Sequence, residues 1–193
     1  MKAIFLDIET NGLNFDLHVP LEIGVIGTDF RTTTPLFTYN SFIQCSKQDW
    51  DRSQEKALEV NGITFEDVKD APTYFHVMNE IESLLKLHKI ICKHAFIICQ
   101  NPSFDRPFFH KIVPEDHMRN LNFPYHWLDL ASMYWMKFFY DKSHIPELSL
   151  SKDAIAKSLD LPSEIKPHRA FNGAKHLMDC YNSLRKSQLN LKE

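Results

Sequence analysis

Two carboxylates separated by one residue are the first candidates for chemistry in this sequence. Asp7 and Glu9 lie in the run DIET, at the end of an apolar segment that begins at Lys2. Side chains alternate between the two faces of a β-strand, so both acids project from one face, roughly 6.5 Å apart along the strand. Buried without a partner they would repel each other, whereas a divalent cation removes that cost, and oxygen ligands favour Mg²⁺ or Mn²⁺. The simpler alternative is a solvated pair of acids at a turn.

A third acid and a histidine follow later in the chain. Asp105 closes the run NPSFD, after an apolar segment at 95–100 and at the start of an expected helix, where the helix dipole favours a carboxylate. His168 opens the run HRAFNGA before the last expected helix, and its near-neutral ordinary pKa suits a general base. Taken alone, each residue also fits an ordinary role, Asp105 as a capping acid and His168 as a solvated loop residue.

The elements that position these residues follow from the spacing of apolar side chains. Strands are expected at 2–8, 21–30 and 36–45 as an antiparallel meander, with a buried strand at 95–100. Thr73 and Ser149 are expected N-caps of two helices. The expected helices cover 53–60, 73–88, 104–112, a segment that follows 126–130 and ends near Tyr140, 149–159 and 169–187. Strands that alternate with helices predict an α/β fold, with a mixed sheet covered by helices on both faces.

Length and charge limit the remaining choices. The chain has 193 residues, of which 44% are hydrophobic and 24% charged, which predicts one globular domain over 1–187 and a C-terminal tail over 188–193. The net charge of −3 argues against a surface that is basic throughout. It leaves room for local binding of nucleic acid, because a metal held by carboxylates can itself receive phosphate.

The cysteines and the apolar runs indicate a cytoplasmic protein. None of the four cysteines forms a CxxC pair, and the N-terminal segment reads as a strand and not as a secretory leader. The spacing of His88, Cys92, His94 and Cys99 fits no common zinc finger, and packing is the favoured role for the two cysteines. Apolar stretches fall far short of the ~20 residues that span a bilayer, so no membrane segment is expected.

Taken together, the three charged segments resemble the DEDDh 3′–5′ exonucleases, the family of proofreading polymerase subunits, RNase T and oligoribonuclease. The motifs stand here as DIETNGL, NPSFD and HRAFNGA, and the segments ALEVNGIT and LSLSKDAIAKSLDLP are also similar to the family. The resemblance runs from Asp7 to about Tyr181. It implies a ribonuclease H-like fold and hydrolysis of phosphodiesters with two metal ions, Mg²⁺ or Mn²⁺, ~4 Å apart.

The resemblance also implies a role for each matching residue. Asp7 would bridge both ions, Glu9 would hold one and Asp105 the other, while His168 would take the proton from the attacking water. The substrate would be the 3′ end of single-stranded DNA or RNA, and the product a nucleoside 5′-monophosphate. Residues expected near that end are Thr10, Leu13 as an apolar wedge, Asn101 and Phe104. Expected partners are a second copy of the chain and a docked polymerase or other replication or repair protein.

The sequence departs from the family at its fourth acid, because the position five residues after His168 is Gly173. One carboxylate fewer predicts a weaker metal site, since removing one member of a cooperating catalytic unit has large effects. The simplest filler of the space beside Gly173 is a water molecule. Asn172 brings no charge, and His176 is a less favoured substitute ligand.

Two functional hypotheses therefore stay open. One is an active exonuclease with a weakened metal site, and the other is a degenerate member of the fold that binds nucleic acid or a protein partner. The presence of three of the four acids together with the histidine favours activity, because an inactive protein would be free to lose them.

Overall fold

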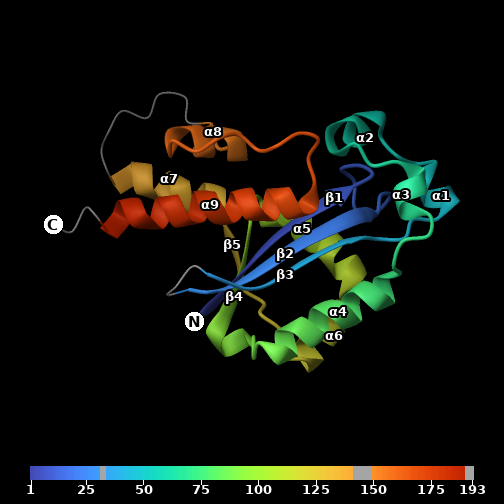
Figure 1. Cartoon of the computed structure of the whole chain (residues 1–193), viewed down its shortest axis with the longest axis horizontal. Helices are drawn as coiled ribbons and strands as arrows, with labels where there is room; N and C mark the ends of the chain where they lie inside the picture. The colour runs from blue at the N-terminus through green and yellow to red at the C-terminus, as the bar shows by residue number, and fades with distance from the viewer. Residues whose placement is uncertain (31–33, 141–148, 190–193) are drawn as a thin grey trace.

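The computed structural model describes residues 1–30, 34–140 and 149–189, and a five-stranded sheet forms its middle layer (Figure 1). The order across the sheet is β3-β2-β1-β4-β5. The strands are β1 (Lys2–Thr10), β2 (Pro20–Asp29), β3 (Pro35–Phe42), β4 (Ala95–Cys99) and β5 (Trp127–Asp129). Strands β1, β2 and β3 pair antiparallel, whereas β4 pairs parallel with β1 and with β5. The expected meander and the expected mixed sheet are both confirmed.

The central strand β1 divides its side chains between two cores. Ile4, Leu6 and Ile8 belong to the core on one face of the sheet. Ala3 and Phe5 belong to the core on the other face. Because side chains alternate along a strand, Asp7 and Glu9 continue the face of Ala3 and Phe5 at the carboxyl end of β1.

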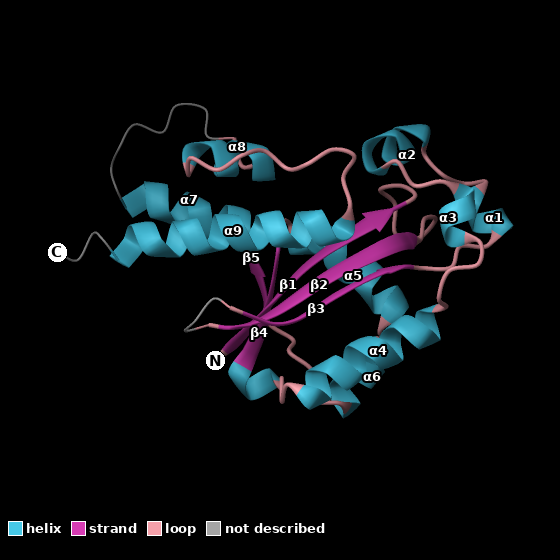
Figure 2. Cartoon of the chain, viewed as in Figure 1, coloured by secondary structure: helices cyan, strands magenta, loops and turns pink. Residues whose placement is uncertain are grey.

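Helices cover both faces of the sheet (Figure 2). The α-helices are α1 (Lys47–Trp50), α2 (Glu55–Asn61), α3 (Phe65–Val68), α4 (Tyr74–Leu87), α5 (Pro102–Ile112), α6 (Glu115–Asn120), α7 (Leu130–Tyr140), α8 (Lys152–Ser158) and α9 (Ala170–Leu189). Helices α4, α5 and α6 supply the core that contains Ile4, and α7, α8 and α9 supply the core that contains Phe5. The expected α/β class with helices on both faces is confirmed.

The differences from the expected elements have local causes. The side chain of Thr73 accepts a hydrogen bond from the backbone of His76, as expected of an N-cap, but Ser149 is not the cap of α8. The cap of α8 is Ser151, which accepts from the backbone of Ala154, so that helix begins later than expected. Strand β5 has three residues, too few to show an alternation, and its sequence reads only as the approach to α7.

The last helix includes part of the expected C-terminal tail. Helix α9 continues to Leu189, so the first residues of the expected tail belong to the helix, and residues 190–193 lie outside the described part of the chain. None of the helices in the described residues combines the length and the apolar character that crossing a bilayer requires.

Candidate active site

The three predicted acids meet at the carboxyl ends of two neighbouring parallel strands. Asp7 and Glu9 lie at the end of β1, and Asp105 lies in the first turn of α5, which follows β4. The Asp105 carboxylate is buried and accepts a backbone hydrogen bond from Ile8, between the other two acids. The sheet therefore brings together residues that are almost a hundred positions apart.

Burial makes these acids hard to ionise without a cation. Burial, and then the neighbouring Asp7 carboxylate, raise the pKa of Glu9 to about 8. Burial and the charge of Asp7 also raise the pKa of Asp105 well above its ordinary value, and burial raises the pKa of Asp7. A set of crowded, buried carboxylates offers the oxygen ligands that a divalent ion such as Mg²⁺ or Mn²⁺ prefers.

A lysine that sequence reasoning missed brings a positive charge to these acids. The Lys152 ammonium lies 3.2 Å from Oδ1 of Asp7 and 2.7 Å from Oε2 of Glu164, with only 15% of its side chain exposed. Burial alone would disfavour the charged ammonium, but the carboxylates of Asp7 and Glu164 raise the pKa of Lys152 above its ordinary value. Lys152 follows the cap of a short helix, where a lysine normally reaches solvent, so the sequence carries no signal of this contact.

Glu164 is a fourth carboxylate at the site, also missed from the sequence. It comes from the loop between α8 and α9, and only 1% of its side chain is exposed. Its Oε2 pairs with Lys152 and lies 4.0 Å from Nδ1 of His168. Within the described residues, its buried Oε1 accepts no hydrogen bond.

Gly173 faces Asp7, at the place where the family resemblance expects an acid. A Cβ atom on Gly173 would lie 2.2 Å from Oδ2 of Asp7, so the Asp7 carboxylate fills this space and the expected water is not needed. The alternative ligand His176 is also not at the site in this role, because its Nε2 lies 2.8 Å from the carbonyl oxygen of Pro162. Asn172 stays half-buried one position away.

A buried ion pair fixes the segment that carries His168. The Arg169 guanidinium donates to both oxygens of Glu22, at 2.8 and 3.0 Å, and the backbone N–H of Ala170 donates to the same carboxylate at 3.1 Å. Glu22 is fully buried on β2, and the backbone N–H of His168 donates to the carbonyl of Val60. His168 is thus held beside the acids, with 30% of its side chain exposed.

A cavity of about 250 Å³ opens beside Glu9 and contains three of the four predicted substrate residues. Thr10, Leu13 and Phe104 line it together with residues of α2. Leu13 is 71% exposed, as an apolar wedge requires, whereas Thr10 is buried and donates its hydroxyl to the carbonyl of Gly12. Asn101 does not line the cavity. It adopts a left-handed φ of 58° and donates its backbone N–H to Asp129.

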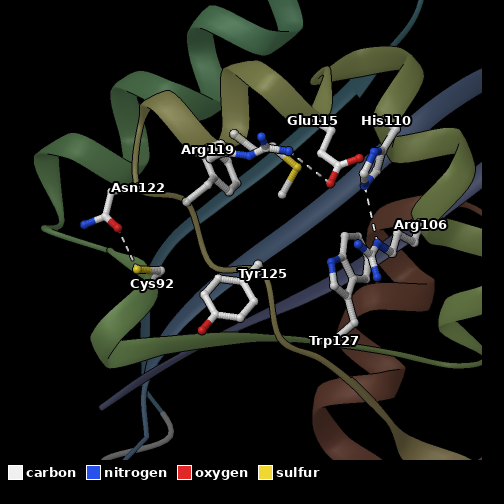
Figure 3. A pocket seen from close by; sticks show the side chains of 10 residues that line it. Cys92, Arg106, His110, Glu115, Arg119, Asn122, Tyr125 and Trp127 are labelled. Atoms are coloured by element: carbon white, nitrogen blue, oxygen red, sulfur yellow. Dashed lines mark hydrogen bonds and ion pairs between the residues drawn. The ribbon is translucent and has the colours of Figure 1, made fainter.

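A second cavity, of about 450 Å³, contains none of the predicted catalytic residues (Figure 3). Arg106, His110 and Trp127 line it, and the thiol of Cys92 there donates to the side-chain oxygen of Asn122. In the described part of the chain, no three His, Cys, Asp or Glu side chains are gathered as a ready-made metal site. The same holds for the acids at the carboxyl end of β1 as they lie around Lys152.

Comparison with known proteins identifies the family and the fold of the chain. A family model described as exonuclease, of the RNase T type, matches residues 4–181. The nuclease domain of 3′hExo, a DEDDh family member bound to rAMP, has a TM-score of 0.72 and 16% identity, over 97% of this chain and 92% of that one. E. coli exonuclease I in complex with a dT13 oligonucleotide has a TM-score of 0.73 and 18% identity, over 98% of this chain but 42% of that one.

A further solved structure, of a 3′-exonuclease that recognises the 3′ end of the histone mRNA stem-loop, gives a TM-score of 0.72 and 16% identity, with coverage of 96% of this chain. The chain spans 64% of that protein and less than half of exonuclease I. At these identities the solved structures establish the shared fold, which is the ribonuclease H-like exonuclease fold.

Proposed function

Because the chain belongs to this exonuclease family, we propose that it hydrolyses single-stranded DNA or RNA from the 3′ end and releases nucleoside 5′-monophosphates with the help of Mg²⁺ or Mn²⁺. The observation that carries the proposal is the meeting of Asp7, Glu9 and Asp105 beside His168, next to a cavity that ends at Leu13. The solved relatives hold a dT13 oligonucleotide, an adenosine monophosphate and an mRNA stem-loop. Both polymers are therefore candidate substrates.

In the proposed reaction, Asp7, Glu9 and Asp105 would hold the divalent cation, which would supply positive charge to stabilise the phosphate and to activate the attacking water. The ring of His168 accepts the proton of the attacking water, because its partial exposure leaves it open to solvent. The apolar side chains of Leu13 and Phe104 take the terminal base, and stacking provides affinity that needs no basic surface. Asn101 stays a predicted substrate contact at the N-terminus of α5.

The test is a time course on 5′-labelled single-stranded DNA and RNA of equal sequence, with Mg²⁺ or Mn²⁺, an EDTA lane and an Asp7→Ala control. We expect a ladder that shortens from the 3′ end, needs the metal and is absent from the control. A comparison of the two polymers then identifies the preferred substrate. Full-length oligonucleotide at high enzyme concentration with Mn²⁺ would contradict the proposed activity.

The second candidate is a catalytically inactive module of the same fold that binds nucleic acid or a protein. Gly173 and the Lys152 ion pairs favour it, because both reduce the negative charge available to metal ions. Fluorescence anisotropy with a labelled oligonucleotide in EDTA separates the candidates. Tight binding without an oligonucleotide ladder supports the inactive module, whereas hydrolysis of the oligonucleotide excludes it.

A further inference from the structure

We propose that the ammonium group of Lys152 takes the place of one of the two cations that the family resemblance implies, so that the site binds a single divalent ion. The inference rests on the metal dependence proposed for the chain and specifies it. At this site the expected fourth acid is replaced by Gly173, and the protein places a lysine among its acids.

The first support is the position of Lys152. Its ammonium bridges two carboxylates, those of Asp7 and Glu164, at 3.2 and 2.7 Å. A fixed positive charge between two buried acids relieves their repulsion as a bridging metal ion would. Asp7 is the acid expected to touch both ions, so the lysine acts on the ligand that the two ions would share.

The second support is Glu164, which brings a carboxylate to the site from a different part of the chain. Its side chain is 1% exposed, and a carboxylate buried in this way stays charged only beside a cation. Its Oε1 accepts no hydrogen bond from the described residues. Lys152 and Glu164 therefore form a neutral pair, and the free Oε1 leaves Glu164 able to bind a metal once the lysine is removed.

The third support is the space at Gly173. The Asp7 carboxylate that pairs with Lys152 lies where any side chain on residue 173 would begin, because a Cβ atom there would be 2.2 Å from Oδ2. An acid at 173 and the observed position of Asp7 therefore exclude each other. Glycine at position 173 therefore permits the position of Asp7 in which its carboxylate pairs with Lys152.

The charge left for a metal ion comes from Glu9 and Asp105. Within the described residues neither of them forms an ion pair, whereas Asp7 already shares Lys152 with Glu164. Two uncompensated carboxylates, with part of the charge of Asp7, match the charge of one divalent ion and fall short of two.

The experiment is a calorimetric titration of Mn²⁺ into the full chain, which counts bound ions without any need for turnover. We expect one Mn²⁺ per chain for the wild type and two for Lys152→Gln, because the substitution frees Asp7 and Glu164. The double variant Lys152→Gln/Glu164→Gln removes the neutral pair and should return to one ion. Lys157→Gln, an exposed site on the same helix, is the matched control and should bind one.

Two ions on the wild type, or one ion on a folded Lys152→Gln variant, would overturn the inference. If that variant does not fold, electron paramagnetic resonance of Mn²⁺ on the wild type still decides, because two bridged ions give a coupled spectrum and one ion does not. Absence of any bound Mn²⁺ overturns the single-ion site and the proposed metal dependence together. One bound ion without an oligonucleotide ladder contradicts the proposed activity alone.

Discussion

At the scale of single residues, the candidate site depends on ion pairs between side chains from distant segments of the chain. Asp7, Glu9, Asp105 and His168 are predictable from the sequence because their three motifs together resemble an exonuclease family, although each residue alone also fits an ordinary role. The side chains that adjust them, Lys152, Glu164 and Glu22, could not be predicted in this way. Each is a charged residue that the sequence would place in solvent, and only the packing of distant segments buries it.

Gly173→Ala provides a direct test of the crowding at Asp7. In an ordinary helix this change stabilises a protein by about 1 kcal/mol, because alanine has the higher helix propensity. Here we expect lower stability instead, because the new Cβ would meet Oδ2 of Asp7 at 2.2 Å. Urea unfolding of both proteins measures the sign of the change.

The matched background for this test is Asp7→Ala, which removes the obstructing carboxylate. In that background Gly173→Ala should be stabilising, so the two substitutions should not be additive. Equal effects of Gly173→Ala in both backgrounds would show that the contact with Asp7 does not matter for stability.

Glu22→Gln addresses the ion pair that holds His168. The substitution leaves the Arg169 guanidinium without its carboxylate and weakens the contact to the backbone of Ala170, so we expect a loss of about 2 kcal/mol in the free energy of unfolding. Turnover should fall as well, because His168 loses its anchor. Glu59→Gln, at an exposed position of α2, is the control for a surface acid. Unchanged stability of the Glu22 variant would argue against a stabilising role of the Glu22–Arg169 ion pair.

At the scale of elements, helix α9 and strand β2 approach so closely that only glycine fits between them. A Cβ on Gly24 would lie 2.3 Å from the backbone carbonyl of Ala170, at the start of α9. Gly24 is also the register partner of Asp7 across the β1–β2 pair. The distance between the helix and the strand therefore determines how near His168 lies to the acids.

Gly24→Ala should force α9 away from the sheet. We expect a loss of about 1–3 kcal/mol of stability, typical of overpacking, with a further loss of turnover because His168 moves. Gly27→Ala is an informative comparison on the same strand. Its Cβ would meet the ring of Phe37, a side chain and not a backbone, so the loss of turnover should be smaller. Equal loss of turnover in both variants would contradict the role of Gly24.

Asp129 connects β5, α5 and α7 through its carboxylate. It accepts hydrogen bonds from the backbone of Asn101, Ala131 and Ser132, at 3.0, 3.1 and 3.0 Å. Burial opposes ionisation, but hydrogen bonds from Ser132, Asn101 and Ala131 outweigh it and lower the pKa of Asp129. The carboxylate thus caps α7 and holds the turn that leads to Asp105.

The lowered pKa of Asp129 predicts a pH dependence of stability. A group whose pKa is lower in the folded state stabilises the protein above the ordinary value of 3.8, and this stabilisation disappears as the pH falls through the folded pKa. Asp129→Asn replaces a charged acceptor by a neutral amide and should therefore cost about 1 kcal/mol at pH 7 and less at pH 3, measured by urea unfolding at both values. A cost that is the same at both pH values would contradict this reading.

The sequence predicted the elements unevenly, for physical reasons. Long strands and helices such as β1, β2 and α4 repeat their apolar pattern often enough to be recognised. The elements α1, α3 and β5 are three or four residues long, and tertiary contacts stabilise them more than any local preference does. The start of α8 was misplaced because two serines stand near it and either suits a cap.

At the scale of the whole molecule, the chain covers most of one solved nuclease domain and a smaller part of larger exonucleases. It spans 92% of the 3′hExo nuclease domain but 42% of exonuclease I. A homodimer, a docked polymerase or repair protein and a cytoplasmic location stay predictions. With a net charge of −3, nucleic acid must be held by local contacts and not by a basic surface.

This charge balance predicts a weak salt dependence of binding. Each phosphate neutralised by Lys or Arg on single-stranded nucleic acid contributes about −0.7 to the slope of log affinity against log salt. We expect a slope smaller in magnitude than about 2, measured by fluorescence anisotropy of a labelled oligonucleotide between about 50 and about 200 mM salt. A much steeper slope would indicate an extended basic binding track.

The ion pair between Lys152 and Glu164 predicts how these positions vary among related chains. The two residues add no net charge, so a lineage can gain or lose them together without disturbing the electroneutrality of the site, but cannot easily gain one alone. Gly173 belongs to the same unit, because Asp7 fills its space. In related chains the three positions should therefore change jointly, and those with an acid in place of the glycine should lack the lysine.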